Sequence, residues 1–126
     1  KKLSDQLAES ERRLRGFFEN SAVFAYFSKK NGATTRINQA ALDLLGYKKD
    51  EFQRLNTFDL YDDPEERNRF INEIEARGFV KDFPIHLKCK DGRVLSCLDT
   101  AALIKDNQGR PVIYQGIIRD VTEWKW

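Results

Sequence analysis

The second half of the chain is predicted to form three consecutive strands, and this pattern constrains the fold more than any other feature. Between residues 83 and 90 the apolar residues occupy every second position, which is the period of a half-buried strand. The turn signals Asp91-Gly92 and Asp106–Gly109 separate this segment from two further strand segments, 94–104 and 111–121. Strands joined by short turns must pair antiparallel, so we expect an antiparallel sheet.

The middle strand of the three is apolar on both of its faces. One face carries Leu95, Cys97, Ala101 and Leu103, and the other carries Val94, Leu98, Ala102 and Ile104. A strand with one solvated face would alternate with polar residues, so both faces of the sheet must be covered here. Helices predicted earlier in the chain can cover one face. For the other face we expect either a docked N-terminal helix or the sheet of a second copy in a dimer.

Residues 1–16 are predicted to form an amphipathic linker helix. The segment is highly charged and places Leu3, Leu7, Leu14 and Phe17 on the a and d positions of one heptad frame. The stripe either packs on its own domain or belongs to a coiled coil from an upstream domain, and two heptads are too few to choose. The residues that we predict to dock this helix or to form a dimer are Leu3, Leu7, Leu14, Leu98 and Ile104.

The first half of the chain is predicted to hold two strands followed by three helices. The strands are at 23–28 and 33–37, joined by Asn31-Gly32, and the helices are at 39–45, 49–52 and 64–77. Asn38 and Asp63 are suited to begin helices, and Gly46 and Gly78 are suited to end them. The predicted order is therefore β-β-α-α-α-β-β-β, which is an α+β fold.

Charge and composition exclude several functional classes. Lys and Arg number 22 against 20 Asp and Glu, so the net charge of +2 gives no footprint for nucleic acid or an anionic membrane. The two cysteines and the single histidine, His86, form no metal-ligand pattern, and we find no signal peptide or membrane-spanning run. We interpret the chain as a cytoplasmic binding module, although the whole protein can be anchored in a membrane elsewhere. Met is absent, even at position 1, so we expect a fragment of a longer protein.

Three short segments in the right order resemble the PAS domain family. They are Asn38-Gln39-Ala40-Ala41 with Leu45-Gly46-Tyr47 and Glu51, then Lys90-Asp91-Gly92, and finally Gly116-Ile117-Ile118-Arg119-Asp120-Val121-Thr122-Glu123. The resemblance implies a five-stranded antiparallel sheet in spatial order 2-1-5-4-3 with helices on one face. It implies structural roles for Asn38, Gly46, Tyr47, Asp91, Gly92 and Gly116. The predicted divisions are a linker helix at 1–16, a PAS sensory domain at 17–123 and the start of a linker to an output domain at 124–126.

The resemblance also implies a function, that of a sensor or dimerisation domain in a bacterial histidine kinase or diguanylate cyclase. Such a domain is not itself an enzyme, and it relays a ligand- or partner-induced shift to a C-terminal output, as in two-component systems. We predict that Asp120, Val121 and Thr122 transmit this shift, with hydrogen bonds to backbone or to Lys29–Asn31 at the first hairpin. In the alternative interpretations, Asp120 and Thr122 only cap a following helix, or the domain is a ligand-free spacer between interaction partners.

A ligand in this family lies between the helices and the inner sheet face. A two-residue turn at Asp91-Gly92 would place Cys89 and Cys97 on opposite faces, whereas a bulged turn, usual in the family, places both inside. The predicted pocket residues are then Phe83, Ile85, Leu87, Leu95, Cys97, Asp99, Tyr114 and Ile118. Asp99 either anchors a ligand or lies in solvent at a bulge or rim, and the pattern alone favours solvent. The cysteines are interpreted as small core residues.

The cofactor is unknown from the sequence. Haem-binding relatives take an axial histidine from the long helix, and 64–77 contains none. Flavin-binding light sensors carry a Cys and an Arg after the second helix, and 55–60 lacks both. A non-covalent flavin, a small metabolite or an empty core stay open. A third hypothesis, a small enzyme using Asp99 and His86 as acid and base, requires two side chains that the bulged register places on opposite faces.

Overall fold

The computed structural model describes residues 2–123, without the side chains at positions 2, 3 and 35. The predictions for Leu3 and for the linker at 124–126 therefore lie outside the described residues. The helical elements are α1 (Lys2–Asn20), α2 (Gln39–Leu45), α3 (Lys49–Phe52), the 3₁₀ helix η1 (Thr57–Leu60) and α4 (Pro64–Arg77). The strands are β1 (Phe24–Ser28), β2 (Thr34–Ile37), β3 (Phe79–Lys88), β4 (Val94–Lys105) and β5 (Pro111–Asp120).

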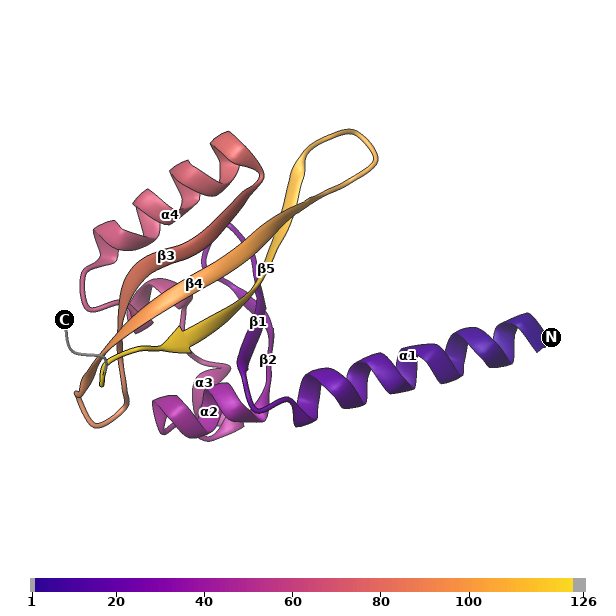
Figure 1. Cartoon of the computed structure of the whole chain (residues 1–126), viewed down its shortest axis with the longest axis horizontal. Coiled ribbons are helices and arrows are strands. Elements are labelled where there is room, and N and C mark those ends of the chain that lie inside the picture. The colour runs from indigo at the N-terminus through magenta and orange to yellow at the C-terminus, as the bar shows by residue number, and fades with distance from the viewer. Residues whose placement is uncertain (1, 124–126) are drawn as a thin grey trace.

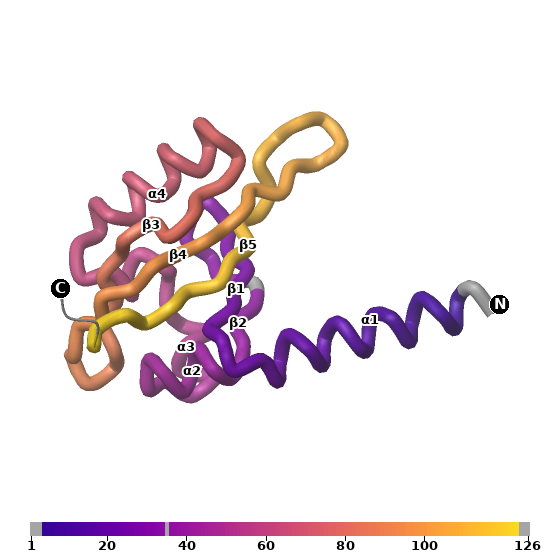
Figure 2. The backbone as a smooth tube through the Cα atoms, viewed as in Figure 1, coloured from indigo at the N-terminus to yellow at the C-terminus, as the bar shows by residue number. Residues whose placement is uncertain are grey.

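The five strands form one antiparallel sheet in the order β2-β1-β5-β4-β3, which confirms the predicted α+β class and topology. Helices α2 and α3 lie near β1 and β2, and α4 runs beside β3, so the helices between β2 and β3 cover one face of the sheet (Figure 1). The β4–β5 hairpin extends beyond the other strands (Figure 2). No helix in residues 2–123 is long and apolar enough to cross a membrane.

Local chemistry sets the helix ends where the sequence predicts them. The Asn38 side chain accepts a hydrogen bond from the Ala41 N–H at 3.2 Å, and Asp63 caps α4 in the same way. Gly46 and Gly78 end α2 and α4 in the left-handed region, with φ of 85° and 86°. The predicted bounds of α2, α3 and α4 are confirmed.

Helix η1 and the first part of strand β3 were not predicted. Helix η1 was missed because it begins in a loop, where the Asn56 side chain caps it and also donates to the Asn31 carbonyl oxygen at 3.0 Å. Strand β3 begins at Phe79 rather than near residue 83. A bulge with Asp82 in the left-handed region, φ 51°, interrupts its alternation there, so the pattern conceals the first part of the strand.

The hairpin between β3 and β4 has the bulged form. Gly92 has φ 92°, and the Cys89 N–H donates to the Arg93 carbonyl oxygen at 2.8 Å. Asp91 accepts a hydrogen bond from the Arg93 N–H. Cys89 and Cys97 are consequently both buried on the helix side of the sheet, as the bulged register predicts.

Helix α1 projects away from the rest of the domain (Figure 1). Among its described side chains, those of the last turn anchor it, and there the Phe18 ring packs on Phe27 with centroids 5.4 Å apart. Leu7 and Leu14 are 63% and 72% exposed, so the alternative in which this stripe packs on its own domain is wrong. The coiled-coil alternative stays a prediction. The helix also continues beyond residue 16, through Gly16, to Asn20.

Asn38 joins α1 to the sheet and to α2. Its side-chain oxygen accepts hydrogen bonds from the Ala25 and Ala41 N–H groups at 3.1 and 3.2 Å. Its amide donates to the carbonyl oxygens of Phe18 and Val23 at 3.1 and 2.7 Å. The side chain is fully buried with all of these groups satisfied, so it fixes the direction in which the chain enters β1.

The two faces of the sheet are covered differently. The inner face, under the helices, contributes most of the buried core, whereas on the outer face Phe79 and Ile117 are about half exposed. An open groove of about 520 Å³ crosses the outer face, lined by side chains that include Phe18, Phe27 and Ala102. The sequence predicts cover on both faces, and the described chain supplies it on one only.

Candidate functional site

A polar pair lies in the middle of the buried inner face. Asp99 on β4 is 1% exposed, and the Tyr26 hydroxyl from β1 lies 3.0 and 2.9 Å from its two carboxylate oxygens. The single hydroxyl hydrogen can therefore be donated to either oxygen. The interpretation of Asp99 as a solvent-exposed residue is wrong. Because its carboxyl group is buried and hydrogen-bonded, a role in the interior is favoured.

Gly116 lets Tyr26 reach Asp99. Strand β5 lies between β1 and β4, and Gly116 is the residue that pairs with Tyr26 on one side and Ala101 on the other. A Cβ atom at this position would lie 2.7 Å from the Ala101 Cβ and 3.0 Å from the Tyr26 hydroxyl oxygen. The phenol passes over the space that a side chain would fill. This is the physical reason for the predicted structural role of Gly116.

Arg67 brings a full positive charge into the same interior. It extends from α4 and is 1% exposed. Its Nη2 donates to the Lys29 carbonyl oxygen at 2.9 Å and to the Ser28 hydroxyl at 3.4 Å. The guanidinium lies 5.3 and 5.4 Å from the ring centroids of Phe70 and Tyr114. Its Nε has no hydrogen-bond partner among the described residues.

Burial shifts the proton equilibria of these groups. Burial raises the pKa of Asp99 to about 7, although the Tyr26 hydrogen bond and the nearby Arg67 charge both oppose this rise. Burial, and then the Asp99 carboxylate, raise the pKa of Tyr26 well above its ordinary value. Burial raises the pKa of Cys97 to about 12, so its thiol is neutral and poorly reactive. Asp99 is thus the group here that can change charge near neutral pH.

A small cavity of about 30 Å³ lies on the inner face. Its lining includes Tyr26, Ser28, Thr57, Tyr61, Arg67 and Leu87. Cofactor sites measure roughly 300 to 1,000 Å³, so this cavity alone would not hold haem or a flavin. A larger space of about 630 Å³ shares Thr34, Ile37 and Phe52 with it as lining residues. The small cavity has the volume of about one water molecule.

The predicted pocket residues lie on the inner face but mostly pack against other core side chains. All are buried except Phe83, which is partly buried beside Phe70, and only Leu87 borders the cavity. The sequence reasoning missed Tyr26 and Arg67. A signal for Arg67 existed, because residues 67, 70, 71 and 74 follow the i, i+3, i+4, i+7 spacing of a buried helical stripe.

Asp120 and Thr122 form a clasp where β5 leaves the sheet. The Thr122 hydroxyl donates to the Asp120 carboxylate at 2.5 Å, and it accepts from the Ser96 N–H of β4 at 2.9 Å. The Val121 N–H donates to the Ser96 carbonyl oxygen at 2.8 Å. The predicted hydrogen bonds to the first hairpin at Lys29–Asn31 are not formed. This hairpin follows Ser28, which pairs with Tyr114, so it lies near the opposite end of β5 from Asp120.

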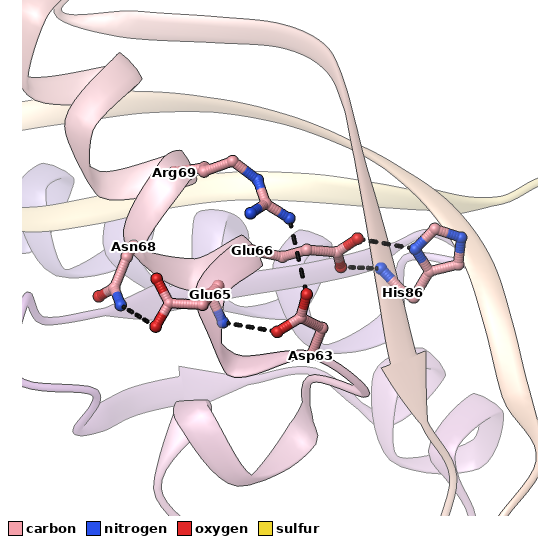
Figure 3. Close-up of polar contacts among 6 residues, drawn as sticks. All are labelled: Asp63, Glu65, Glu66, Asn68, Arg69 and His86. Carbon is pink, nitrogen blue, oxygen red and sulfur yellow. Dashed lines mark hydrogen bonds and ion pairs between the residues drawn. The ribbon is translucent and has the colours of Figure 1, made fainter.

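His86 lies apart from Asp99 in a surface cluster at the start of α4 (Figure 3). Its Nδ1 is 2.8 Å from one Glu66 carboxylate oxygen, and its backbone N–H donates to the other at 2.7 Å. Asp63 in turn caps Glu65 and lies 3.8 Å from Arg69. His86 is exposed and Asp99 is buried, so the shared cleft that the enzyme hypothesis requires is not formed.

These features define a class of α+β module in which helices enclose a small space on one face of a five-stranded antiparallel sheet. The family comparison agrees with this class, since the model described as "PAS domain" matches residues 20–123. The chain belongs to the PAS domain family. Modules of this family are sensory rather than catalytic, and the chain is a PAS sensor domain of the kind found in signal transduction.

Two curated relatives are much longer than the chain. The methyl sulfide methyltransferase-associated sensor of Methanosarcina acetivorans is 32% identical over 97% of this chain and 12% of the relative. The probable diguanylate cyclase DgcE of Escherichia coli is 26% identical over 94% of this chain and 11% of the relative. The chain therefore spans about an eighth of the length of these proteins or less.

Two solved structures show the same fold. The PAS domain of an HTR-like protein from Haloarcula marismortui matches with a TM-score of 0.77 and 21% identity, over 94% of this chain and 98% of that one. A PAS domain from a two-component sensor histidine kinase matches with a TM-score of 0.75 and 15% identity, over 90% and 98%. At these identities the likeness establishes the fold alone.

Proposed function

We propose that the chain is a cytoplasmic sensor and dimerisation domain that relays a conformational shift to a C-terminal output domain. The observation that carries this proposal is the uncovered apolar surface. The outer sheet face and the α1 stripe are both exposed, and neither covers the other within the described chain.

A second copy of the chain is the proposed cover. Phe18, which follows Phe17 of the stripe at the end of α1, lines the outer-face groove together with Phe27 and Ile117, so the stripe ends beside the sheet face. An isologous dimer would bring both surfaces of one protomer against the same surfaces of its partner. Burial of these side chains in a dimer is favourable because it removes apolar surface from water.

The proposed relay runs along β4 to the clasp. Asp99 in the interior and Ser96 at the clasp are three positions apart on this strand. Asp99 pairs with Ile118, and Cys97 pairs with Asp120, so a shift between β4 and β5 at the interior also displaces the end of β5. The clasp of Asp120 and Thr122 would then move the segment that follows it.

The proposed output is a histidine kinase or a diguanylate cyclase. The support is the probable diguanylate cyclase among the relatives and the histidine kinase domain among the similar structures. The second candidate function, a ligand-free spacer that only mediates interactions, is favoured by the small interior cavity.

The dimer is tested by the mass of the domain in solution. Multi-angle light scattering is expected to give a dimer for the wild type and a monomer for Ile117→Asp and for Leu14→Asp. Asn107→Asp, in the exposed β4–β5 turn, is the matched control and should remain a dimer. A monomeric wild type at high concentration, or dimers of all three variants, would overturn the proposed dimer.

The relay is tested in the full-length protein with the activity of its output domain as the readout. Replacing Asp120 and Thr122 together by Ala is expected to uncouple that activity from its control while the domain stays folded. Glu123→Ala, at the adjacent exposed position, should leave control intact. Unchanged control in the double variant would sink the relay and leave the spacer function in its place.

A further inference from the structure

A cleft with a basic lining, which we call the basic cleft, lies between the edge strand β2, helices α2 and α3 and the loop that follows α3. Its volume is about 630 Å³, and small-molecule sites measure roughly 300 to 1,000 Å³. Arg36, Lys49 and Arg54 line it, and Glu19 is the single carboxylate among its described lining residues. Three cations and one carboxylate give this lining a net charge of +2, as large as that of the whole chain.

Two of the three cations have no counter-charge in the described part of the chain. The Arg36 guanidinium lies 3.0 Å from the Glu19 carboxylate, so its charge is balanced. Lys49 and Arg54 form no ion pair with any described residue. A negative group in the cleft can therefore approach two unpaired positive charges without breaking an existing ion pair.

The basic cleft also has an apolar part. Leu42 and Phe52 are buried there, and Ile37 and Leu55 pack partly buried against the core. An apolar body in contact with these side chains would lose surface to water, which is favourable. A ligand that suits this lining therefore combines an apolar body with a negative charge.

Hydrogen bonds hold the walls of the basic cleft together. The Thr57 N–H donates to the Gly32 carbonyl oxygen at 2.8 Å, and the hydroxyl oxygens of Thr34 and Thr57 are 2.9 Å apart. The Asn56 side chain donates to the Asn31 carbonyl oxygen at 3.0 Å. These bonds join the segment after α3 to the β1–β2 hairpin, so the cleft is formed before a ligand binds and little ordering is required.

Charge distinguishes the basic cleft from a second groove beside α2. This acidic groove, of about 870 Å³, is lined by the carboxylates of Glu19, Asp43 and Asp120 and by one cation, Arg119. The two spaces share Gln39 of α2, but the described lining of the acidic groove has a net charge of −2. An organic anion is therefore attracted to the basic cleft and repelled from its neighbour.

We propose that the basic cleft binds an amphipathic organic anion, with its apolar body against Leu42 and Phe52 and its charged group beside Lys49 and Arg54. The inference goes beyond the proposed function, because this binding requires neither the dimer nor the relay. The two cations are exposed, so salt screens their attraction and the affinity should fall as the ionic strength rises.

The carboxylate 1-naphthoate tests the site, with uncharged 1-naphthamide as its matched control. Titration of the isotope-labelled domain, followed by nuclear magnetic resonance, gives both the Kd and the position of the bound compound. We expect 1-naphthoate to shift the backbone amide signals of β2, α2 and α3 and to bind at least about tenfold more tightly than 1-naphthamide at low salt. Shifts confined to the outer-face groove or the acidic groove, or equal Kd values for the two compounds, would overturn the site.

Matched charge reversals test the role of the two unpaired cations. Lys49→Glu combined with Arg54→Glu should weaken 1-naphthoate binding at least about tenfold. Lys88→Glu combined with Lys105→Glu makes the same change in net charge at exposed positions of the sheet and should bind as the wild type does. Equal losses in both double variants would mean that net charge alone attracts the probe, and would overturn the site.

The variant designed to break the dimer separates this inference from the proposed function. Ile117→Asp should bind 1-naphthoate as the wild type does, whether or not the wild type is a dimer. Loss of binding in Ile117→Asp would place the probe on the outer face and overturn the basic cleft as its site. A monomeric wild type that still binds 1-naphthoate in the cleft would overturn the dimer and support this inference.

Discussion

The two faces of the sheet differ in what surrounds their side chains. On the inner face, Asp99, Tyr26 and Arg67 are buried with aromatic and aliphatic residues under the helices. On the outer face, Phe79 and Ile117 remain about half exposed around an open groove. The inner face therefore determines whether the domain folds, and the outer face is available for association. Substitutions on the two faces should affect different measurements.

The largest expected difference is between two phenylalanines on helices. Phe70 on α4 is fully buried against the inner face, and Phe17 on α1 is 79% exposed. Phe70→Ala should lower the free energy of unfolding by about 3–5 kcal/mol through lost burial and a cavity. Phe17→Ala should change it by less than about 0.5 kcal/mol. Urea denaturation of the monomer measures both, and similar losses would mean that the exposed stripe of α1 contributes to folding as the inner face does.

The next expected effect is a pH dependence that comes from the inner face. The folded-state pKa of Asp99, about 7, lies above its ordinary value, so folded protein holds a proton that unfolded protein releases. The contribution of Asp99 to the free energy of unfolding is therefore fully present below about pH 4 and declines as the pH rises through 7.

Between pH 5 and pH 8 the expected loss is about 3 kcal/mol. Groups with lowered pKa values, such as Glu75, act mainly below this window. Denaturation measured at a series of pH values should show this decline in the wild type and a flatter profile in Asp99→Asn. Parallel profiles would mean that Asp99 does not hold its proton in the folded state.

Substitutions of two glycines should have smaller effects on stability, and these effects should be opposite in sign. Gly116→Ala places a methyl group against Ala101 and the Tyr26 hydroxyl and should cost about 1–3 kcal/mol. A Cβ atom at Gly16 in α1 meets nothing within 4 Å, so Gly16→Ala should stabilise the helix by about 0.5–1 kcal/mol and raise the helix content. Thermal denaturation monitors the first and far-ultraviolet circular dichroism the second. A neutral Gly116→Ala would show that Tyr26 does not need this passage.

The smallest expected effect belongs to an ion pair on the outer face. Arg119 and Asp82 are 2.9 Å apart, and both side chains are nearly half exposed. Arg119→Ala should therefore change the free energy of unfolding by less than about 1 kcal/mol, and high salt should remove the difference. A larger change that persists in high salt would mean that the outer face contributes to folding as the inner face does.

Local chemistry explains why most of the fold was predictable. The Asn38 and Asp63 caps, the glycine ends and the period of two in 83–90 act within a few residues of chain, so the sequence displays them directly. The bulge at Asp82 was not predictable, because the turn that it makes interrupts the alternation that would reveal it. The apolar pattern of residues 94–104 predicted cover on both sheet faces by either a docked N-terminal helix or a second copy. The exposure of Leu7 and Leu14 excludes the first of these, and the second stays a prediction.

The interior site was only partly predictable. Asp99 and its neighbours on β4 follow from alternation once the register is known. The Tyr26–Asp99 bond joins residues 73 positions apart across an intervening strand, and no local pattern encodes it. Arg67 was hidden by its charge, because charged residues are expected on the solvated side of a helix. Its position in the apolar stripe was the signal that outweighed this expectation.

Anchoring α1 at one end has a mechanical consequence. Its 19 residues span about 28 Å. In its last turn, Phe18 contacts Phe27 and Asn38, and Glu19 pairs with Arg36. A tilt of about 10° at this pivot would displace the far end of the helix by about 5 Å. The Asn38 side chain lies at this pivot. It donates to the Phe18 carbonyl oxygen of α1 and accepts from the N–H groups of Ala25 in β1 and Ala41 in α2. A change at β1 that tilted α1 would therefore move the far end of this helix by a larger distance than the change itself.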